Sequence, residues 1–149
     1  MKLLLVASTG GHLAQLIALE GAWAGHERHW VTFEKPDAVA ALVDERVTWA
    51  HHPTTRNIKN AVRNTGLALR LLRRVRPDVI VSCGAGVAVP FFVVARVLRI
   101  RTLYLEVLDR IDMPTLTGRL VYPLTDRFCV QWEEQLIAYP DGILVGPAL

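Results

Sequence analysis

Short apolar runs alternate with longer segments of helical periodicity along the whole chain. The apolar runs predict seven strands, at residues 2–8, 27–33, 46–49, 78–82, 102–106, 127–130 and 143–145. The periodic segments predict six helices, at residues 12–24, 37–43, 58–75, 87–98, 114–122 and 133–138. Strands that alternate with helices are typical of a parallel sheet built from βαβ units. The pattern therefore predicts an α/β fold, with one Rossmann-like parallel sheet and helices on both of its faces.

Composition supports one folded domain over residues 1–149. Hydrophobic residues make up 52% of the chain and charged residues 21%, which excludes a disordered chain. No internal repeat, low-complexity tract or linker-like segment divides the sequence. Cys83 and Cys129 belong to no C-x-x-C pair, as expected of a protein in the reducing cytoplasm. The net charge of +3 indicates an anionic partner.

No segment is predicted to cross a membrane. The longest uncharged stretch, residues 79–95, contains Gly84, Gly86 and Pro90, which predict a strand, a turn and a helix instead of a membrane-spanning helix. The apolar run that opens the chain ends at Ser8, too soon for the apolar region of a signal peptide.

Gly10, Gly11 and His12 follow the first predicted strand and open the first predicted helix. In a parallel α/β sheet, ligands bind at the carboxyl ends of the strands. Two glycines let a ligand approach the backbone, and a helix N-terminus favours a phosphate there. The spacing matches neither the dinucleotide-binding G-x-G-x-x-G pattern nor the P-loop. The turn is therefore either a phosphate-binding loop or a tight connection between a strand and a helix.

Two titratable residues at this edge of the sheet are candidate catalytic groups. His12 lies at a helix start, where the helix dipole disfavours the charged imidazole, so a neutral His12 is able to accept a proton from a hydroxyl. The alternative is that His12 only caps the turn. Glu106 ends an apolar strand, where a carboxylate costs free energy unless it is paired. Glu106 is either a hydroxyl acceptor or a salt-bridge partner of Arg110.

A long basic stretch lies in the middle of the chain, where residues 47–77 contain no acidic residue. The basic side chains of the helix predicted at residues 58–75 share one face: Lys59, Arg63, Arg70, Arg73 and Arg74. A solvated helix face usually mixes both signs of charge, so a face of one sign indicates phosphate groups in lipids or in nucleic acid. This helix lacks the interleaved aromatic residues that stack on bases, which argues against nucleic acid.

The helix predicted at residues 87–98 is apolar almost all round until Arg96 and Arg99. Such a helix is enclosed in a core or faces lipid, and a protein interface is a third alternative. Apolar residues beside arginines suit the surface of an anionic membrane. We expect the membrane-facing residues to be Arg70, Arg73, Arg74, Phe91, Phe92, Arg96 and Arg99.

The sequence contains no clear metal-binding motif. His51 and His52 are adjacent, so a regular strand directs them to opposite sides. Asp109 and Asp112 have the spacing D-x-x-D, and not the D-x-D that accompanies a divalent ion on a nucleotide-sugar diphosphate. We expect neither a bound metal nor a cofactor.

Five motifs, in this order and spacing, carry a resemblance to a known family: STGGHL at 8–13, HHPTTRNIKN at 51–60, SCGAGVAVPF at 82–91, DMPTLTGRL at 112–120 and VQWEEQ at 130–135. Together they resemble bacterial PssD-type polysaccharide-biosynthesis proteins. These proteins are relatives of the membrane-associated subunit of the eukaryotic two-chain GlcNAc transferase that assembles dolichol-linked oligosaccharides. The likeness covers essentially the whole chain.

The resemblance implies the N-terminal, acceptor-side lobe of a split GT-B glycosyltransferase, whose single-chain relative is MurG. A separate partner chain would bind the donor, a UDP-sugar, and this chain would be inactive alone. The acceptor would be a polyprenyl-diphosphate-linked saccharide in exopolysaccharide or capsule synthesis. The eukaryotic subunit usually has an N-terminal anchor, whereas this sequence starts on a strand. We therefore expect peripheral attachment to the anionic, cytoplasmic face of the cell membrane.

For such an enzyme we expect roles for individual residues. His12 would be the base that removes the acceptor proton, or would assist it, and Glu106 would orient the acceptor. Residues expected to bind the acceptor or its diphosphate are Gly10, Gly11, Asn57, Lys59, Gly84, Gly86 and Arg110. Two alternatives remain, a non-catalytic scaffold that recruits and activates the catalytic partner and a Rossmann nucleotide-binding module.

Overall fold

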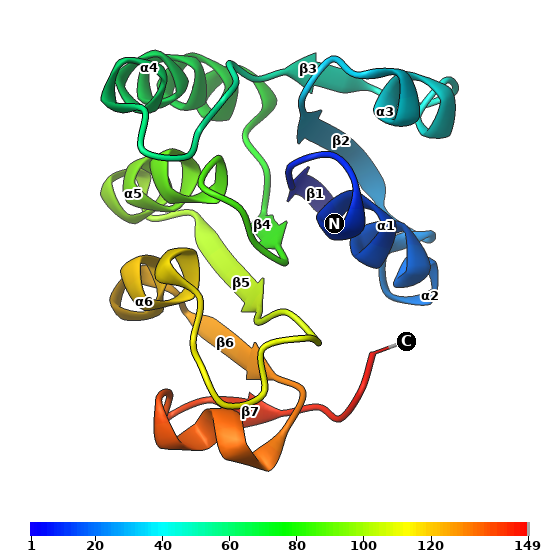
Figure 1. Ribbon diagram of the computed structural model, residues 1–149. Helices are drawn as coiled ribbons and strands as arrows, with labels where there is room; N and C mark the ends of the chain where they lie inside the picture. Colours follow the sequence, from blue (N-terminus) through cyan, green and yellow to red (C-terminus); the bar gives the residue numbers. More distant parts are fainter. Residues whose placement is uncertain (149) are drawn as a thin grey trace.

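The computed structural model describes residues 1–148 as a seven-stranded sheet with helices on both faces (Figure 1). All neighbouring strands are parallel, in the order β3-β2-β1-β4-β5-β6-β7. The strands are β1 (Lys2–Val6), β2 (Glu27–Thr32), β3 (Val47–Trp49), β4 (Val79–Ser82), β5 (Arg101–Leu105), β6 (Arg127–Val130) and β7 (Ile143–Leu144). The predicted α/β, Rossmann-like fold is confirmed.

The helices lie close to their predicted positions. They are α1 (Gly11–Ala18), α2 (Glu20–Trp23), α3 (Pro36–Ala41), α4 (Ile58–Val75), α5 (Ala88–Leu98) and α6 (Leu116–Val121), with 3-10 turns at Tyr122–Leu124 and Glu133–Ile137. The single helix predicted at residues 12–24 is two helices in the structure, and the last predicted helix is a 3-10 turn. A 3-10 turn suits so short a segment, because helix nucleation is costly.

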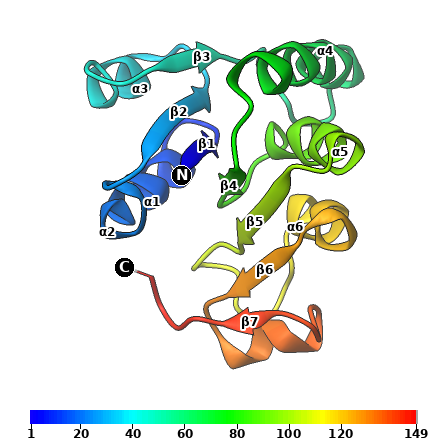
Figure 2. The same ribbon diagram turned by 180° about the vertical axis from the view of Figure 1, so that it is seen from behind.

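The strand order reverses direction at the centre of the sheet, between β1 and β4. From β1 the chain builds outward through β2 to β3, and it then crosses back to β4 and builds toward the other edge. As a result α1, α2 and α3 lie on one face, and α4, α5 and α6 lie on the other (Figures 1 and 2). Ligands of such sheets bind at the carboxyl ends of the strands, beside this reversal.

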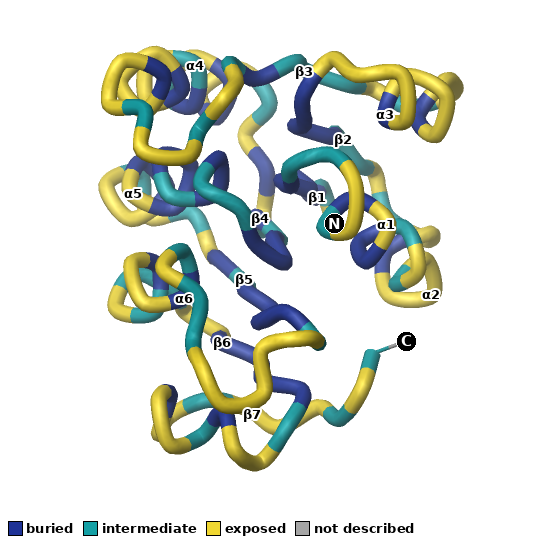
Figure 3. Tube along the Cα trace, viewed as in Figure 1, coloured by how far each residue is buried: buried dark blue, intermediate teal, exposed yellow. Residues whose placement is uncertain are grey.

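Each face of the sheet has its own hydrophobic core, shown in dark blue in Figure 3. The core under α4, α5 and α6 is rich in aromatic rings, where Tyr104 stacks on Phe128 with ring centroids 5.0 Å apart. The core under α1 and α2 contains Trp23 and Trp30, whose rings meet edge to face at 5.4 Å.

Phe91 and Phe92 belong to the core and do not face lipid. Both side chains are fully buried. The reason is that α5 is the middle helix of its layer and packs against α4, α6 and the sheet, which cover three of its sides. Only one face of α5 stays exposed, including Val93 at 43% and Val97 at 75%. The expectation that these two phenylalanines contact a membrane was wrong.

The two helical layers differ in charge. The helices α1, α2 and α3 contain no lysine or arginine, but they contain Glu20 and Asp37. The helices α4, α5 and α6 contain no acidic residue, and their basic residues are Lys59, Arg63, Arg70, Arg73, Arg74, Arg96 and Arg119. One side of the molecule is therefore basic along all of its helices. No helix among the described residues is both long and apolar enough to span a bilayer.

Candidate functional site

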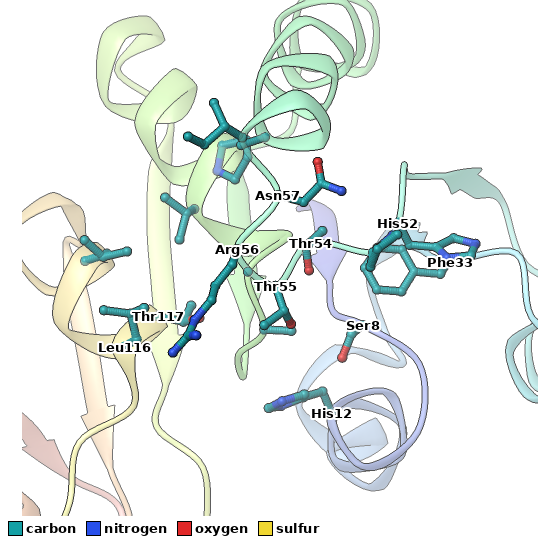
Figure 4. Close-up of a pocket in the computed structure, with 18 of the residues that line it drawn as sticks. Ser8, His12, Phe33, His52, Thr54, Thr55, Arg56, Asn57, Leu116 and Thr117 are labelled. Carbon is teal, nitrogen blue, oxygen red and sulfur yellow. The ribbon is translucent and has the colours of Figure 1, made fainter.

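A cleft of about 1040 Å³ opens at the carboxyl edge of the sheet (Figure 4). Its walls are the turn after β1, the loop between β3 and α4, the start of α5 and the exposed side of α6. Its polar lining residues are Ser8, Thr9, His12, Lys35, His52, Thr54, Thr55, Arg56, Asn57, Thr65 and Thr117. The cleft thus lies beside the reversal in strand order, where this architecture places ligands.

The cleft has a polar side and an apolar side. The turn after β1 and the loop before α4 supply most of the hydroxyl, imidazole and basic groups, whereas α4, α5 and α6 supply the apolar wall. The aliphatic and proline residues of that wall are Ile58, Ala61, Val89, Pro90, Val93, Leu116 and Leu120. Several of them are exposed on the outer surface as well, including Leu116 at 72%. No aspartate or glutamate is among the described residues that line the cleft.

His12 lies in the first turn of α1, and its ring points into the cleft (Figure 4). Its Nδ1 atom is 3.2 Å from the carbonyl oxygen of Cys83. Because a carbonyl only accepts, Nδ1 carries the proton, which leaves Nε2 of the neutral ring with a free lone pair. Burial lowers the pKa of His12 below its ordinary 6.5, partly offset by the Cys83 carbonyl and the carboxylates of Asp109 and Glu106. The imidazole is therefore a neutral proton acceptor at pH 7.

The glycines near His12 have different structural roles. Gly84 has a φ of +135°, and a Cβ there would lie 2.6 Å from Cε1 of His12, so the ring packs directly on this glycine. Gly86 lines the cleft, where a Cβ would lie 3.2 Å from Oγ1 of Thr54. Gly10 is exposed, and its N–H donates to the Asp37 carboxylate at 2.9 Å, so it is not free for a phosphate. Of these three predicted ligand contacts, only Gly86 borders the cleft.

The loop before α4 is fixed by the asparagine that caps α4 and by two asparagines within the helix. Asn57 caps the helix, accepting from the N–H of Asn60 at 2.9 Å, and the Asn60 amide donates to the carbonyl of Pro53 at 2.9 Å. One turn further on, the Asn64 side chain pairs with both backbone groups of His51, at 2.8 and 2.9 Å. Residues four apart share one helix face, so both buried amides point toward the loop. Sequence reasoning missed Asn64, although an inward-facing asparagine at this spacing was the available signal.

Glu106 is fully buried and does not reach the cleft. Its carboxylate accepts hydrogen bonds from the hydroxyls of Thr115, at 2.9 Å, and of Tyr139. Burial and the bond to Glu106 raise the pKa of Tyr139, so that its hydroxyl keeps its proton and remains a donor. The predicted catalytic role for Glu106 was wrong. As a hydroxyl acceptor it binds two hydroxyls of its own chain, and it forms none of the ion pairs found among the described residues.

Glutamines after β6 hold the loop that follows β5. Gln131 donates to the backbone carbonyl of Glu106 at 2.8 Å. Gln135 donates to the carbonyls of Val107 and Arg110 at 3.1 and 3.0 Å. Both glutamines are buried, so they satisfy carbonyl groups that water does not reach. The segment at 130–135 thus positions a loop at the same edge of the sheet as the cleft.

Comparison with known proteins identifies the family. The family described as "Oligosaccharide biosynthesis protein Alg14 like" matches residues 34–147. This chain belongs to that family. The UDP-N-acetylglucosamine transferase subunit ALG14 of Rattus norvegicus is 26% identical, over 98% of this chain and 82% of the rat protein. The human subunit of the same name is 24% identical over the same shares. The predicted relationship to a glycosyltransferase subunit is confirmed.

Solved structures share the fold of this Alg14-like chain. Acinetobacter baumannii MurG matches 87% of the chain with a TM-score of 0.70 and 18% identity. The Methanocaldococcus jannaschii UDP-GlcNAc 2-epimerase, solved with UDP-GlcNAc and UDP, matches 97% with a TM-score of 0.75 and 15% identity. The Alg14-like chain spans 40% of the former protein and 46% of the latter. It therefore has the fold of one GT-B lobe, the N-terminal one.

The other predicted contacts of the Alg14-like chain are divided between the cleft and the surface. Asn57 lines the cleft, whereas Lys59, Arg110 and Gly11 do not. Lys59 is exposed beside the cleft because its place in the first turn of α4 directs it outward. Two basic residues that were not predicted to bind the acceptor, Lys35 and Arg56, line the cleft instead. Within residues 1–148, no three His, Cys, Asp or Glu side chains lie close enough to share a metal ion.

Proposed function

We propose that this chain is the acceptor-binding subunit of a two-chain GT-B glycosyltransferase. The enzyme would transfer a sugar from a UDP-sugar, held mainly by a separate donor-binding chain, to a polyprenyl-diphosphate-linked saccharide. The names of its relatives, which are UDP-N-acetylglucosamine transferase subunits, support a UDP-sugar donor. We place the reaction in the synthesis of an exopolysaccharide or capsule.

The amphipathic cleft is the observation that carries this proposal. A lipid-linked acceptor has an anionic diphosphate between a polar sugar and an apolar polyprenyl chain. The cleft offers basic and hydroxyl groups on one side, no carboxylate among its described lining residues, and an apolar wall on the other side. That wall continues onto the outer surface of α5 and α6 through Val93, Leu116 and Leu120, which are exposed. A diphosphate and the first units of a lipid therefore fit the two sides of one site.

In the proposed reaction His12 is the general base. The acceptor hydroxyl oxygen attacks the anomeric carbon of the donor sugar, the bond from that carbon to the diphosphate breaks, and UDP leaves with the electron pair. The hydroxyl proton passes to Nε2 of His12, which is unprotonated because Nδ1–H donates to Cys83. The partner chain would bring the donor and close the cleft against water.

An apolar groove on the face of the sheet that carries α1 and α2 supports the proposal of a partner chain. Side chains of the central strands, among them Val81, Leu103 and Leu105, border a groove of about 410 Å³ beside α1 and α2. No helix of the described chain covers this part of β5 and β6 (Figures 1 and 2). The donor-binding chain is the occupant we propose, because burying this surface would favour stable association.

The basic layer, formed by α4, α5 and α6, supports the proposal of peripheral binding to the cytoplasmic face of the cell membrane. Its helices have no acidic residue, and exposed apolar side chains lie among the basic ones: Ile58, Val62, Val93, Val97, Leu116 and Leu120. Each lysine or arginine near an anionic bilayer contributes about 1 kcal/mol to binding, and inserted apolar groups add to this. Such an orientation would place the apolar side of the cleft against the lipid.

The proposal is tested with the chain and its co-expressed donor-binding partner. Transfer of labelled sugar from a panel of UDP-sugars to polyprenyl-diphosphate-linked acceptors is measured in vesicles that contain anionic lipid. We expect transfer by the pair and none by either chain alone. Transfer by this chain alone would contradict the two-chain arrangement. Failure of the intact pair with every lipid-diphosphate acceptor would contradict the assigned substrate class.

A further inference from the structure

We propose that Arg56 binds the diphosphate of the acceptor and selects acceptors that carry one. This inference rests on the function proposed above and adds a specificity residue to it. In the sequence Arg56 lies in the same basic stretch as the arginines of α4, and it was not predicted to bind the acceptor. In the structure Arg56 stands apart from them, in the loop between β3 and α4, and lines the cleft. Figure 4 shows its side chain extending from this loop toward Leu116 and Thr117 on α6.

The backbone of Arg56 is held in an unusual conformation. Among the described residues, four non-glycine residues have positive φ: Arg56, Arg76, Ala85 and Arg99. Arg76 and Arg99 are the C-caps of α4 and α5, where a left-handed residue commonly ends a helix. Arg56 instead precedes the N-cap of α4, and both Arg56 and Ala85 line the cleft. A left-handed residue outside a helix end costs free energy, and such residues are concentrated at functional sites.

The loop around Arg56 is fixed by its neighbours. Asn57, the next residue, is held by its bond to the N–H of Asn60, and Pro53 is held by the Asn60 amide. Arg56 is therefore anchored on both sides by hydrogen bonds of one buried residue. An arginine held in this way loses less conformational freedom on binding than one on a mobile loop.

The guanidinium of Arg56 has no partner in the described part of the chain. It forms no hydrogen bond, and the ion pairs there join Lys2 or Arg46 to Glu27 and Arg28 to Glu45. No carboxylate of the described chain lines the cleft to neutralise it. A guanidinium presents five N–H donors in a planar fork that matches two oxygens of a phosphate group. The diphosphate of the acceptor supplies such oxygens. It is attached to the polyprenyl chain, which fits the apolar wall of the cleft.

The test measures binding of geranyl diphosphate, a short prenyl diphosphate, to the complex of the full chain and its partner by calorimetry. Asparagine tolerates the left-handed conformation, so Arg56→Asn removes the guanidinium with little backbone strain. We expect the Kd to rise about tenfold or more, as expected when charge-assisted hydrogen bonds are lost. The Kd of Arg56→Lys should lie between those of Arg56→Asn and the wild type, because lysine keeps the positive charge but lacks the planar fork of N–H donors. Geraniol, which lacks the diphosphate, should bind all forms alike.

Arg76→Asn is the matched control. Arg76 has the same φ of +50° as Arg56 and is also exposed, but it lies at the far end of α4, 18 residues of helix away or about 27 Å. This variant should bind geranyl diphosphate as the wild type does. An equal loss of affinity with Arg76→Asn would show that the overall positive charge of the chain determines binding, and would overturn the specific role of Arg56.

Sugar transfer by the same variants separates this inference from the proposed function. With Arg56→Asn we expect a higher KM for the lipid acceptor and an unchanged KM for the UDP-sugar. Wild-type binding of geranyl diphosphate by Arg56→Asn would overturn the role of Arg56 and leave the proposed function standing. Absence of geranyl diphosphate binding by the wild type would overturn both. A raised KM for the UDP-sugar alone would assign Arg56 to the donor and overturn the inference.

Discussion

His12 and Gly84 are in direct contact, across two turns that are 72 positions apart in the sequence. A methyl group on Gly84 would lie 2.6 Å from Cε1 and 2.8 Å from Nδ1 of the His12 ring. The carbonyl of the preceding residue, Cys83, accepts the hydrogen bond from Nδ1. The turn after β4 therefore fixes both the position and the tautomer of the imidazole on the turn after β1.

Gly84→Ala should impair sugar transfer by displacing His12. The added methyl group overlaps the ring, and the φ of +135° disfavours any side chain. A displacement of the base by about 1 Å is expected to lower kcat by about a hundredfold. Gly66→Ala is the control, because Gly66 lies on α4 with open space around it. That variant should keep wild-type turnover and gain up to about 1 kcal/mol of stability from helix propensity. Normal turnover by Gly84→Ala would argue against a base fixed by this contact.

The pH dependence of transfer should report the protonation of His12. A general base acts only when neutral, and burial lowers the His12 pKa below 6.5. The rate constant kcat/KM should therefore be flat around pH 7 and fall tenfold per pH unit below this lowered pKa. His12→Gln should lose most of the activity together with this acidic limb, as measured in a pH series with the reconstituted pair. If the acidic limb persists in His12→Gln, the limb belongs to another group. Full activity of this variant would favour the alternative of a non-catalytic scaffold.

Glu106→Gln should affect stability more than chemistry. The carboxylate accepts from both Thr115 and Tyr139, and an amide offers only one oxygen, so one hydroxyl would lose its acceptor. We expect a loss of about 1–3 kcal/mol in the free energy of unfolding, measured by urea denaturation. The acidic limb of the pH profile should persist and move to lower pH, because Glu106 does not reach the cleft but its carboxylate contributes to raising the His12 pKa. Loss of that limb in a folded Glu106→Gln enzyme would restore a catalytic role.

Substitutions at two adjacent residues of α5 should distinguish core packing from membrane contact. Phe92 is fully buried, so Phe92→Ala should cost about 3–5 kcal/mol of stability. Val93 is 43% exposed on the basic layer, so Val93→Glu should change stability by little and weaken sedimentation with anionic vesicles. Val39→Glu on α3, an exposed valine of the opposite face, is the control and should bind vesicles normally. Equal vesicle binding by both glutamate variants would contradict the proposed orientation on the membrane.

Local sequence pattern determined the elements, the sheet type and the location of the site. The apolar strands and the periodic helices are local features, and parallel strands place their carboxyl ends at one edge, so the turn at His12 was correctly expected there. Only the tertiary structure decided which way individual side chains point. The pattern of α5 favoured lipid over a core, but its neighbours α4 and α6 buried Phe91 and Phe92.

The same distinction holds within the site. Glu106 ends its strand as predicted, yet its partners Thr115 and Tyr139 lie 9 and 33 positions further along the chain. Arg56 lies among other arginines in the sequence, but the left-handed backbone before α4 brings it to the cleft. Spacing along one strand or helix determines which residues share a face. Contacts between elements depend on how those elements pack, and packing depends on the whole chain at once.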